Sequence, residues 1–404
     1  MRTRMIWLVP ACLLLAGCGD IALRDILAQT VTGATSLAQP SAPNDLTVTM
    51  LSVSKLHLAW TDSSSNEMGF KIERSTTGTT GWTLVGDVVA NTTIWDDVGL
   101  ADGTSYSYRV RAYNTAGDSG DTNIASATTD TLIPIALVTI VSGGDSFQMG
   151  DGSYGPNPPV SETIQAYFNM STYDITNAMF AQFVADDGYS TQSYWTTNGW
   201  AWKGNIIQPN YWSDSGFNSA NQPVGGVSWY EAVAFCNWRT VREGRTVAYD
   251  AYGQATLSAT GYRLPTEVEW EYAAAKGGSS QSERIYAWGD TWDSSKAVCS
   301  VPPAAATSTA DVGSRSPGGD TPQGLVDMSG NAWQWCSDNY EADAGISSGT
   351  NRYYFADDSP DSLFIYRGGA WLFTIENRFR CAYRNGYGVP GSRYTSNSFR
   401  VVRH

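Results

Sequence analysis

The chain has 404 residues, of which 42% are hydrophobic and 16% charged, and its formal net charge is −14. This length exceeds one ordinary hydrophobic core, so the sequence predicts two or three folding units. The acidic balance argues against nucleic acid as a partner, because such a partner needs a basic surface, and it favours a cation such as calcium. The 16 Trp and 22 Tyr residues are typical of secreted or surface proteins that present aromatic side chains to ligands.

Residues 1–18 have the pattern of a targeting segment. Arg2 and Arg4 precede a short apolar run, and small residues then lead to Cys18. The run is too short to span a bilayer permanently, and its end resembles a bacterial lipobox. We therefore expect a lipoprotein signal peptide ending at a lipidated Cys18, with a plain signal peptide as the alternative. The lipid bilayer would then be a partner, and the location would be the cell envelope, periplasmic or at the cell surface.

Residues 19–42 lack a persistent period and lead into a Pro-Ser-Ala-Pro sequence, so we expect a tether. Residues 43–130 contain seven short runs of alternating polarity separated by Ser, Gly, Asn or Asp, which predict a β-sandwich. Trp60 and Tyr106, the latter as a candidate tyrosine corner, resemble those of a fibronectin type III domain. We expect this domain to be a spacer, with partner binding as the alternative.

Residues 138–404 are predicted to form a further unit that contains short helices. Thr176 can cap one helix, whose apolar residues share a face. Two further helices begin at capping boxes, and the first of them should run to about Arg242. The capping-box pairs are Ser228 with Glu231 and Thr266 with Glu269.

Several runs in this unit resemble the formylglycine-generating enzyme (sulfatase-modifying factor) family, whose fold is similar to that of C-type lectins. They are FQMG at 147–150, GYRLPTEVEWEYAA at 261–274, YAWGD at 286–290 and the closing stretch 324–402. The second run is the most specific, because an unrelated amphipathic helix does not explain its Arg-Leu-Pro turn. The predicted fold class is therefore multidomain, with an all-β fibronectin type III sandwich followed by an α+β, loop-rich domain like that of formylglycine-generating enzymes and C-type lectins.

The chemistry of that family does not carry over directly. The resemblance implies a copper-dependent oxidase with two active-site cysteines shortly after an Arg-Gly-Gly-Ser run, since soft thiolates suit copper(I). Here the run is Arg367-Gly368-Gly369-Ala370, and Phe373 stands at the first cysteine position. We therefore expect neither catalytic residues nor copper.

Other metal and nucleophile sites are restricted by the residue counts. With two histidines in the chain, a three-histidine metal site cannot be built. After Cys18, four cysteines remain, and their pairing into one or two disulfides is left open. These are Cys236, Cys299, Cys336 and Cys381.

A calcium site is the remaining prediction for a cofactor. The resemblance implies that calcium is bound by the run 327–334, through side-chain oxygens at its ends and backbone carbonyls between them. The ligands would be Asp327, Gly330, Ala332 and Gln334. Calcium accepts a neutral amide oxygen, although Gln in place of the family's Glu weakens the site. A turn held by Asn and Gly alone is the alternative.

The closing stretch is rich in residues that form binding hot spots. The candidate ligand-binding residues are Trp371, Phe373, Ile375, Tyr383, Asn385, Tyr387, Arg393 and Tyr394. This composition also resembles the variable region of proteins diversified by retroelements, which here would be 370–399. The alternative is that the aromatics are core, which is favoured for Trp333, Trp335 and Trp371.

These observations favour a non-catalytic, lipid-anchored surface protein that binds a protein or carbohydrate ligand at its C-terminal face. The alternative is a formylglycine-generating oxidoreductase, or a related protein-modifying enzyme, that acts on sulfatases. A structural role in the envelope is a third interpretation.

Overall fold

The computed structural model describes residues 38–141, 143–156, 158–164, 167–278, 281–341, 348–350 and 352–404. The predicted signal peptide, its Cys18 and most of the predicted tether lie outside these residues. The chain divides into two compact units, an N-terminal and a C-terminal one. Within the described ranges, no helix has the length and apolar character that crossing a membrane requires.

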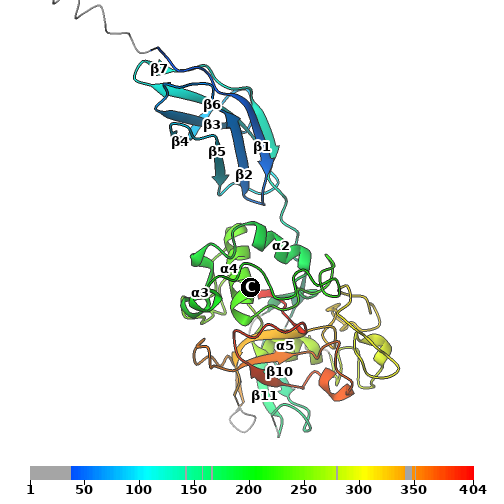
Figure 1. Ribbon diagram of the computed structural model, residues 1–404. Coiled ribbons are helices and arrows are strands. Elements are labelled where there is room, and N and C mark those ends of the chain that lie inside the picture. Colours follow the sequence, from blue (N-terminus) through cyan, green and yellow to red (C-terminus); the bar gives the residue numbers. More distant parts are fainter. Residues whose placement is uncertain are drawn as a thin grey trace, which may run out of the picture. The chain divides into compact units, whose positions relative to one another are not determined.

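The N-terminal unit is a β-sandwich of two sheets (Figure 1). One sheet has the order β1-β2-β5; the other has the order β4-β3-β6-β7, with β8 paired to β6. Trp60 of β2 and Phe70 of β3 contact each other across the sandwich, with ring centroids 5.7 Å apart. The strands are β1 (Asn44–Met50), β2 (Lys55–Thr61), β3 (Gly69–Ser75), β4 (Thr83–Val89), β5 (Ile94–Val98), β6 (Ser105–Asn114), β7 (Gly117–Asp118) and β8 (Ala125–Thr128).

This sandwich forms because its strands alternate in polarity. In β2, Leu56, Leu58 and Trp60 are buried while the residues between them are partly exposed. Alternation of this kind places one face of a strand against the opposite sheet. Tyr106, the candidate tyrosine corner, is buried. The predicted fibronectin type III sandwich is thus confirmed.

The C-terminal unit is an α+β domain with long connecting loops. Its strands form three small sheets, with the orders β10-β11-β14, β18-β12-β9 and β16-β15-β13-β17. The strands are β9 (Leu137–Ile140), β10 (Asp145–Met149), β11 (Val160–Ile164), β12 (Phe168–Ser171), β13 (Trp333–Asn339), β14 (Gly349–Thr350), β15 (Phe364–Arg367), β16 (Asn385–Gly388), β17 (Asn397–Ser398) and β18 (Val402–Arg403).

Three of the four helices described in this unit begin where the sequence predicts, and the fourth, α3, was not predicted. Figure 1 shows α2, α3 and α4 close together, and α5 beside β10. The helices are α2 (Asn177–Ala185), α3 (Thr197–Lys203), α4 (Trp229–Arg242) and α5 (Glu267–Ala275), with 3₁₀ turns η1 (Gln192–Tyr194), η2 (Ser294–Lys296) and η4 (Glu376–Phe379). Thr176 caps α2, and both predicted capping boxes are formed. At α4, Ser228 Oγ accepts from the Glu231 amide at 3.1 Å, while Glu231 Oε2 accepts from the Ser228 amide at 2.8 Å.

The core of the C-terminal unit is built from aromatic side chains. Trp229, Trp238, Trp270 and Trp335 are among its largest fully buried residues. Nearly every residue of α4 and α5 is buried, which is expected of a helix surrounded by the rest of a domain. The loops of this unit therefore pack on an aromatic core.

Candidate functional site

The turn after β15 requires glycine at both positions. Gly368 and Gly369 have φ of 99° and 76°, a conformation that side-chain-bearing residues rarely adopt. A Cβ atom on Gly369 would lie 2.7 Å from the Phe379 ring and 2.8 Å from the Arg378 carbonyl oxygen. The turn thus brings Gly369 against Arg378 and Phe379 of the loop that follows it.

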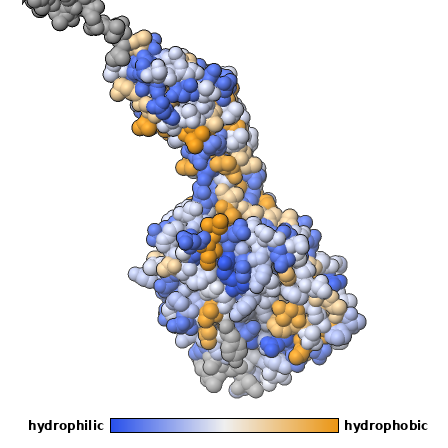
Figure 2. All heavy atoms as spheres, viewed as in Figure 1, coloured by the Kyte–Doolittle hydropathy of each residue, from blue (hydrophilic) through white to orange (hydrophobic). Residues whose placement is uncertain are grey.

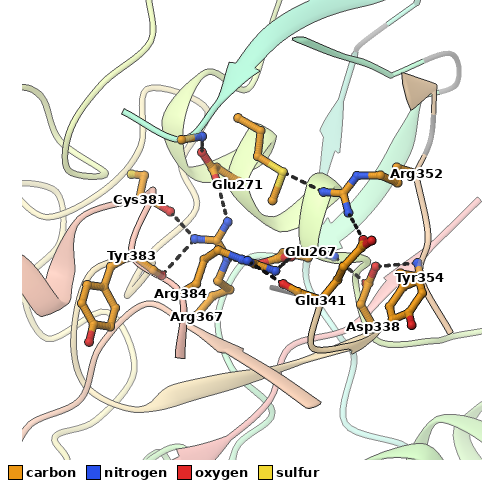
Figure 3. A network of polar contacts seen from close by, with 12 residues as sticks. Glu267, Glu271, Asp338, Glu341, Arg352, Tyr354, Arg367, Cys381, Tyr383 and Arg384 are labelled. Carbon is orange, nitrogen blue, oxygen red and sulfur yellow. Dashed lines mark hydrogen bonds and ion pairs between the residues drawn. The ribbon is translucent and has the colours of Figure 1, made fainter. Parts of the chain in front are cut away.

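Arg367, the last residue of β15, closes the loop that follows it (Figure 3). Its Nη1 donates to the carbonyl oxygens of Cys381 at 2.8 Å and Tyr383 at 2.9 Å. Its guanidinium also pairs with Glu267 at 3.2 Å and with Glu271, both on α5. We call this arrangement the Arg367 clamp, because one buried cation holds both ends of the segment 368–383 against α5.

Further ion pairs surround the Arg367 clamp (Figure 3). Arg384 donates to both carboxylate oxygens of Glu267, at 2.6 and 2.9 Å. Although burial opposes ionisation, Arg384 and Arg367 hold the pKa of Glu267 below its usual value. Asp338 accepts from the Glu267 amide at 2.7 Å, and burial raises the pKa of Asp338 to about 7. Paired carboxylates therefore fix the base of the loop.

The backbone between the ends of the loop is held as well. The Trp371 amide donates to the Asn331 carbonyl at 3.0 Å, and the Ser300 hydroxyl donates to the Trp371 carbonyl at 2.9 Å. Near the end of the loop, the Ser329 hydroxyl donates to the Phe379 carbonyl at 2.8 Å. The side chains of 372 and 374–376 remain exposed, with Ile375 at 58%. A fixed backbone here presents exposed side chains.

Three predicted ligand-binding residues lie at the edge of the core. Phe373 and Tyr383 are half-buried and pack on Trp333, with ring centroids 5.4 and 6.1 Å from its ring. Arg378 lies over both of these side chains, at 5.2 and 4.9 Å from their centroids. Trp371 is half-buried, whereas Trp333 and Trp335 are buried, as expected of core residues.

The other predicted ligand-binding residues lie in different surroundings. Arg393 pairs with the buried Glu231 at 3.2 Å and donates to the Gln208 carbonyl, so it holds two loops together. Tyr394 is 63% exposed, like the exposed Ile375. Asn385 begins β16 and is half-buried. The side chain of Tyr387 lies outside the described part of the chain.

The structure adds a segment that the sequence analysis did not single out, 204–222. Phe217 contacts Trp371 with ring centroids 5.6 Å apart, and Tyr211 contacts Phe217 at 6.5 Å. The Gly226 amide donates to the Tyr394 carbonyl at 3.0 Å, and the Asn210 amide donates to the Gly226 carbonyl at 3.0 Å. Segments 204–222, 371–376 and 391–396 therefore adjoin, and together we call them the loop face.

The run 327–334 does not fit a calcium ion. Gln334 Oε1, a predicted ligand, already accepts from Trp270 Nε1 at 2.6 Å and Arg400 Nε at 2.8 Å. Gln334 Nε2 donates to the Asp327 carbonyl at 2.8 Å, and Asp327 Oδ2 accepts from the Gly313 amide at 2.8 Å. The fully buried Arg400 guanidinium thus occupies the Gln334 oxygen that a calcium ion would need as a ligand.

The Gly330 carbonyl, another predicted calcium ligand, gives no better fit. The Gly330 carbonyl accepts from the Ala332 amide at 3.0 Å, within a tight turn. Among the residues with described positions, no group of three or more His, Cys, Asp or Glu could hold a metal ion. The contacts of this run therefore favour the alternative, a turn held by hydrogen bonds.

The four cysteines of this unit are free and buried. Burial raises the pKa of the Cys381 thiol to about 12, and it raises the pKa of Cys299 as well. Because cysteine binds copper(I) as its thiolate, a raised thiol pKa disfavours copper binding at these residues. None of them lies in the loop 368–380.

Comparison with known proteins agrees with this architecture. Residues 125–404 match the family described as "Sulfatase-modifying factor enzyme 1-like domain", and residues 41–128 match "Fibronectin type III domain". The formylglycine-generating enzyme of Thermomonospora curvata is 28% identical over 299 residues, which cover 66% of this chain and 94% of that protein. That of Bos taurus is 27% identical over 304 residues, with 67% and 74% covered.

Two further matches extend the comparison. The hercynine oxygenase of Mycolicibacterium thermoresistibile is 26% identical over 233 residues, and the match spans about half of each protein, 54% of this chain and 47% of the relative. Among solved structures, Treponema denticola variable protein 1 superposes with a TM-score of 0.51 at 20% identity, covering 66% of this chain and 94% of that one. Such identity shows a shared fold alone. By the match over 125–404, the chain belongs to the sulfatase-modifying factor enzyme 1-like domain family, and a fibronectin type III domain precedes that domain.

Proposed function

We propose that this protein is a cell-envelope lipoprotein, anchored through Cys18, that binds a protein or carbohydrate ligand at the loop face without catalysis. The Arg367 clamp is the observation that carries this proposal. It fixes both ends of segment 368–383 to α5, so the exposed side chains of 372 and 374–376 can change without unfolding the core. A rigid backbone under exposed side chains lowers the entropy cost of binding.

The composition of the loop face supports a binding role. Its three segments contain many Asn, Ser, Tyr and Trp residues, as binding loops of antibodies do. Figure 2 shows small, separated hydrophobic patches on a mostly hydrophilic surface of the C-terminal unit. Scattered patches of this kind are usual for a protein that is stable without a permanent partner.

The proposed lack of catalysis has support from the sequence and from burial. Segment 367–380 contains no cysteine, and the four free thiols of the C-terminal unit, including that of Cys381 just after this segment, are buried. Of the two histidines, His57 lies on β2 of the sandwich with its Nδ1 2.6 Å from Asp96 Oδ1, and His404 directly follows β18. A hydrolase triad would need a histidine close to its nucleophile.

The second candidate function is a formylglycine-generating or related protein-modifying oxidoreductase, which membership in the family favours. A direct assay separates the two candidates. The purified chain would be loaded with copper(I) and incubated with a cysteine-containing sulfatase peptide. We expect neither stoichiometric copper binding in the presence of a chelator nor an aldehyde product. If the chain binds stoichiometric copper or forms an aldehyde, the oxidoreductase is supported and the non-catalytic proposal is wrong.

Binding at the loop face is tested by comparing exposed with buried aromatic and apolar residues. We expect the double variant Ile375→Ala with Tyr394→Ala to bind the ligand more weakly. The loss of binding free energy should be about 1 to 4 kcal/mol per hot-spot residue, with little change in Tm. Trp333→Ala should instead cost about 3 to 5 kcal/mol of stability. If the double variant lowers Tm as much as Trp333→Ala does, the exposed residues are structural and the proposal is wrong.

We further propose that the segment 370–399 is the part open to diversification. It begins after the glycine turn and ends at the buried Phe399, so its backbone is anchored at both ends. A reverse transcriptase gene with a near-copy of this coding segment in the neighbouring DNA would support the proposal. An adjacent sulfatase gene would favour the oxidoreductase instead.

A further inference from the structure

A surface hollow lies beside the first turn of α2, within the C-terminal unit. Its volume is about 270 Å³. The lining residues are Asn177, Ala178, Ala181, Trp212, Asn218 and Ala220. Trp212 and Asn218 belong to segment 204–222, so one wall of the hollow is part of the loop face. We call this site the α2 hollow.

The lining of the α2 hollow carries no charge and combines a largely apolar surface with two side-chain amides. Its six described residues are an indole, two amides and three alanines. A charged ligand would lose hydration there without gaining a partner of opposite charge, which is costly. A neutral ligand with an apolar face and several hydroxyl groups suits such a lining, because an indole packs on the apolar face and amides bond hydroxyls.

The start of α2 offers no anion site either. The Asn177 amide donates to the Gln222 carbonyl and the Ala178 amide to the Ala220 carbonyl, both at 3.0 Å. The next amide donates to the Thr176 side chain. Since these N–H groups already have protein acceptors, the positive end of the helix is not directed at a ligand.

Two side chains of the lining, those of Asn177 and Trp212, are held in position. Asn177 Nδ2 donates to the carbonyl oxygens of Phe217 at 2.8 Å and Ser219 at 2.9 Å, so Oδ1 is the remaining polar atom of that amide. The Trp212 ring contacts the fully buried Phe180, with centroids 6.4 Å apart. A half-buried indole beside an oriented amide acceptor is thus built before any ligand arrives.

We infer that the α2 hollow binds a single ring of a neutral carbohydrate. Its volume of about 270 Å³ lies just below that of typical ligand pockets, which span about 300 to 1,000 Å³, so it suits one ring rather than a large ligand. Phe217, the residue before Asn218, contacts Trp371 and Tyr211, which continue the surface toward the rest of the loop face. The inference rests on the proposed function and names the ligand class.

The experiment uses the purified full chain in detergent, probed with an array of neutral oligosaccharides and their acidic counterparts carrying uronic or sialic acid. We expect binding to at least one neutral oligosaccharide and weaker binding to its acidic counterpart. Titration with that sugar should show at least a fivefold loss of affinity for Trp212→Ala and for Asn218→Asp. Trp82→Ala removes a half-buried indole from the N-terminal unit and is the matched control, expected to bind unchanged.

The variants separate this inference from the proposed function. Asn218 is exposed, so Asn218→Asp tests the hollow even if Trp212→Ala fails to fold. Absence of any neutral sugar bound by the wild type, or a loss below fivefold in the folded variants, overturns the inference. If a ligand is lost with Ile375→Ala and Tyr394→Ala but kept with Trp212→Ala, the loop face binds its ligand elsewhere, and only the hollow is wrong. If binding of a neutral sugar depends on Trp212 and Asn218 but not on Ile375 or Tyr394, the hollow stands and the wider loop face does not.

Discussion

Gly369 shows how a single residue shapes the loop. Its backbone has φ of 76°, and an added Cβ would meet the Phe379 ring and the Arg378 carbonyl at less than 3 Å. Gly324 provides a matched comparison, because it has φ of 87° but nothing lies within 4 Å of its Cβ position. The two glycines share a left-handed backbone conformation and differ in the space around their Cβ positions.

We expect Gly369→Ala to destabilise the C-terminal unit more than Gly324→Ala does. Both variants should lose about 1 to 2 kcal/mol from the left-handed conformation. Gly369→Ala should lose about 1 to 3 kcal/mol more, since the loop end must move to admit a methyl group. Urea unfolding of the two variants measures the difference. Equal losses would mean that loop 368–383 adapts easily and is not a rigid support.

Asp174 is a second residue with a measurable consequence. Both of its carboxylate oxygens are buried without a hydrogen-bond partner among the described residues, and its ion pair with Arg400 spans 3.6 Å. Burial raises the pKa of Asp174 to about 8, although Arg400 opposes this. The folded state therefore holds a proton that the unfolded chain releases at its ordinary pKa, about 3.9.

From the sign of this shift, the contribution of Asp174 to stability falls as pH rises from about 4 to about 8. Asp338, with its pKa raised to about 7 by burial, acts in the same direction. Glu267 and Glu269, whose pKa values are lowered, act oppositely and lose their contribution in acid. We expect Asp174→Asn to make the decline of stability between about pH 5 and pH 8 less steep, because this range lies between the unfolded and folded pKa values of Asp174. A thermal-unfolding series across pH measures it, and an unchanged slope would show that Asp174 is ionised throughout.

At the scale of elements, helices α2, α4 and α5 were predictable, whereas α3 and the loop face were not. Ser228 with Glu231, and Thr266 with Glu269, specify helix starts through contacts three residues apart, so a sequence pattern carries them. Segment 204–222 has no period, and its place beside Trp371 depends on contacts more than 150 residues away. Arg393 and Glu231 are also more than 150 residues apart, so the sequence predicts a ligand-binding role for Arg393 but not its ion pair.

The run before β13 shows the same limit for the predicted calcium site. The resemblance supplied oxygen atoms at the right spacing, from Asp327 to Gln334. Whether those oxygens are available depends on Trp270 and Arg400, which come from α5 and the chain end. Ligand spacing is local, but competition for an oxygen atom is a tertiary property.

We therefore expect calcium to leave the stability of the protein unchanged. A ligand bound at a hundred times its Kd would add about 2.7 kcal/mol, which is easily seen as a rise in Tm. Thermal unfolding with millimolar calcium, and again with a chelator, should give the same Tm within error. Magnesium serves as the control for general ionic effects. A rise specific to calcium would show that Gln334 exchanges Arg400 for a cation.

At the scale of the whole molecule, the two units divide the work that we propose. The sandwich has paired charges on the strands around β6, such as Arg109 with Glu73 at 2.7 Å, and serves as a spacer in this proposal. The C-terminal unit places a rigid loop on a buried aromatic core. For a binding domain of this kind to act at the envelope, the chain must be held at a membrane, and Cys18 is the proposed anchor.

The anchor is tested with the two cysteines of residues 1–18. Cys18→Ser should abolish labelling by a radiolabelled fatty acid and release the protein from membranes, because the serine hydroxyl cannot form the thioether. Cys12→Ser is the matched control, since Cys12 lies in the apolar run of the same segment and not at the predicted cleavage site. It should be labelled and retained like the wild type. One acyl chain gives only marginal membrane binding, so firm retention of the wild type would indicate more than one chain on Cys18. Labelling that survives Cys18→Ser, or that is lost with Cys12→Ser instead, would show that the anchor has been assigned to the wrong residue.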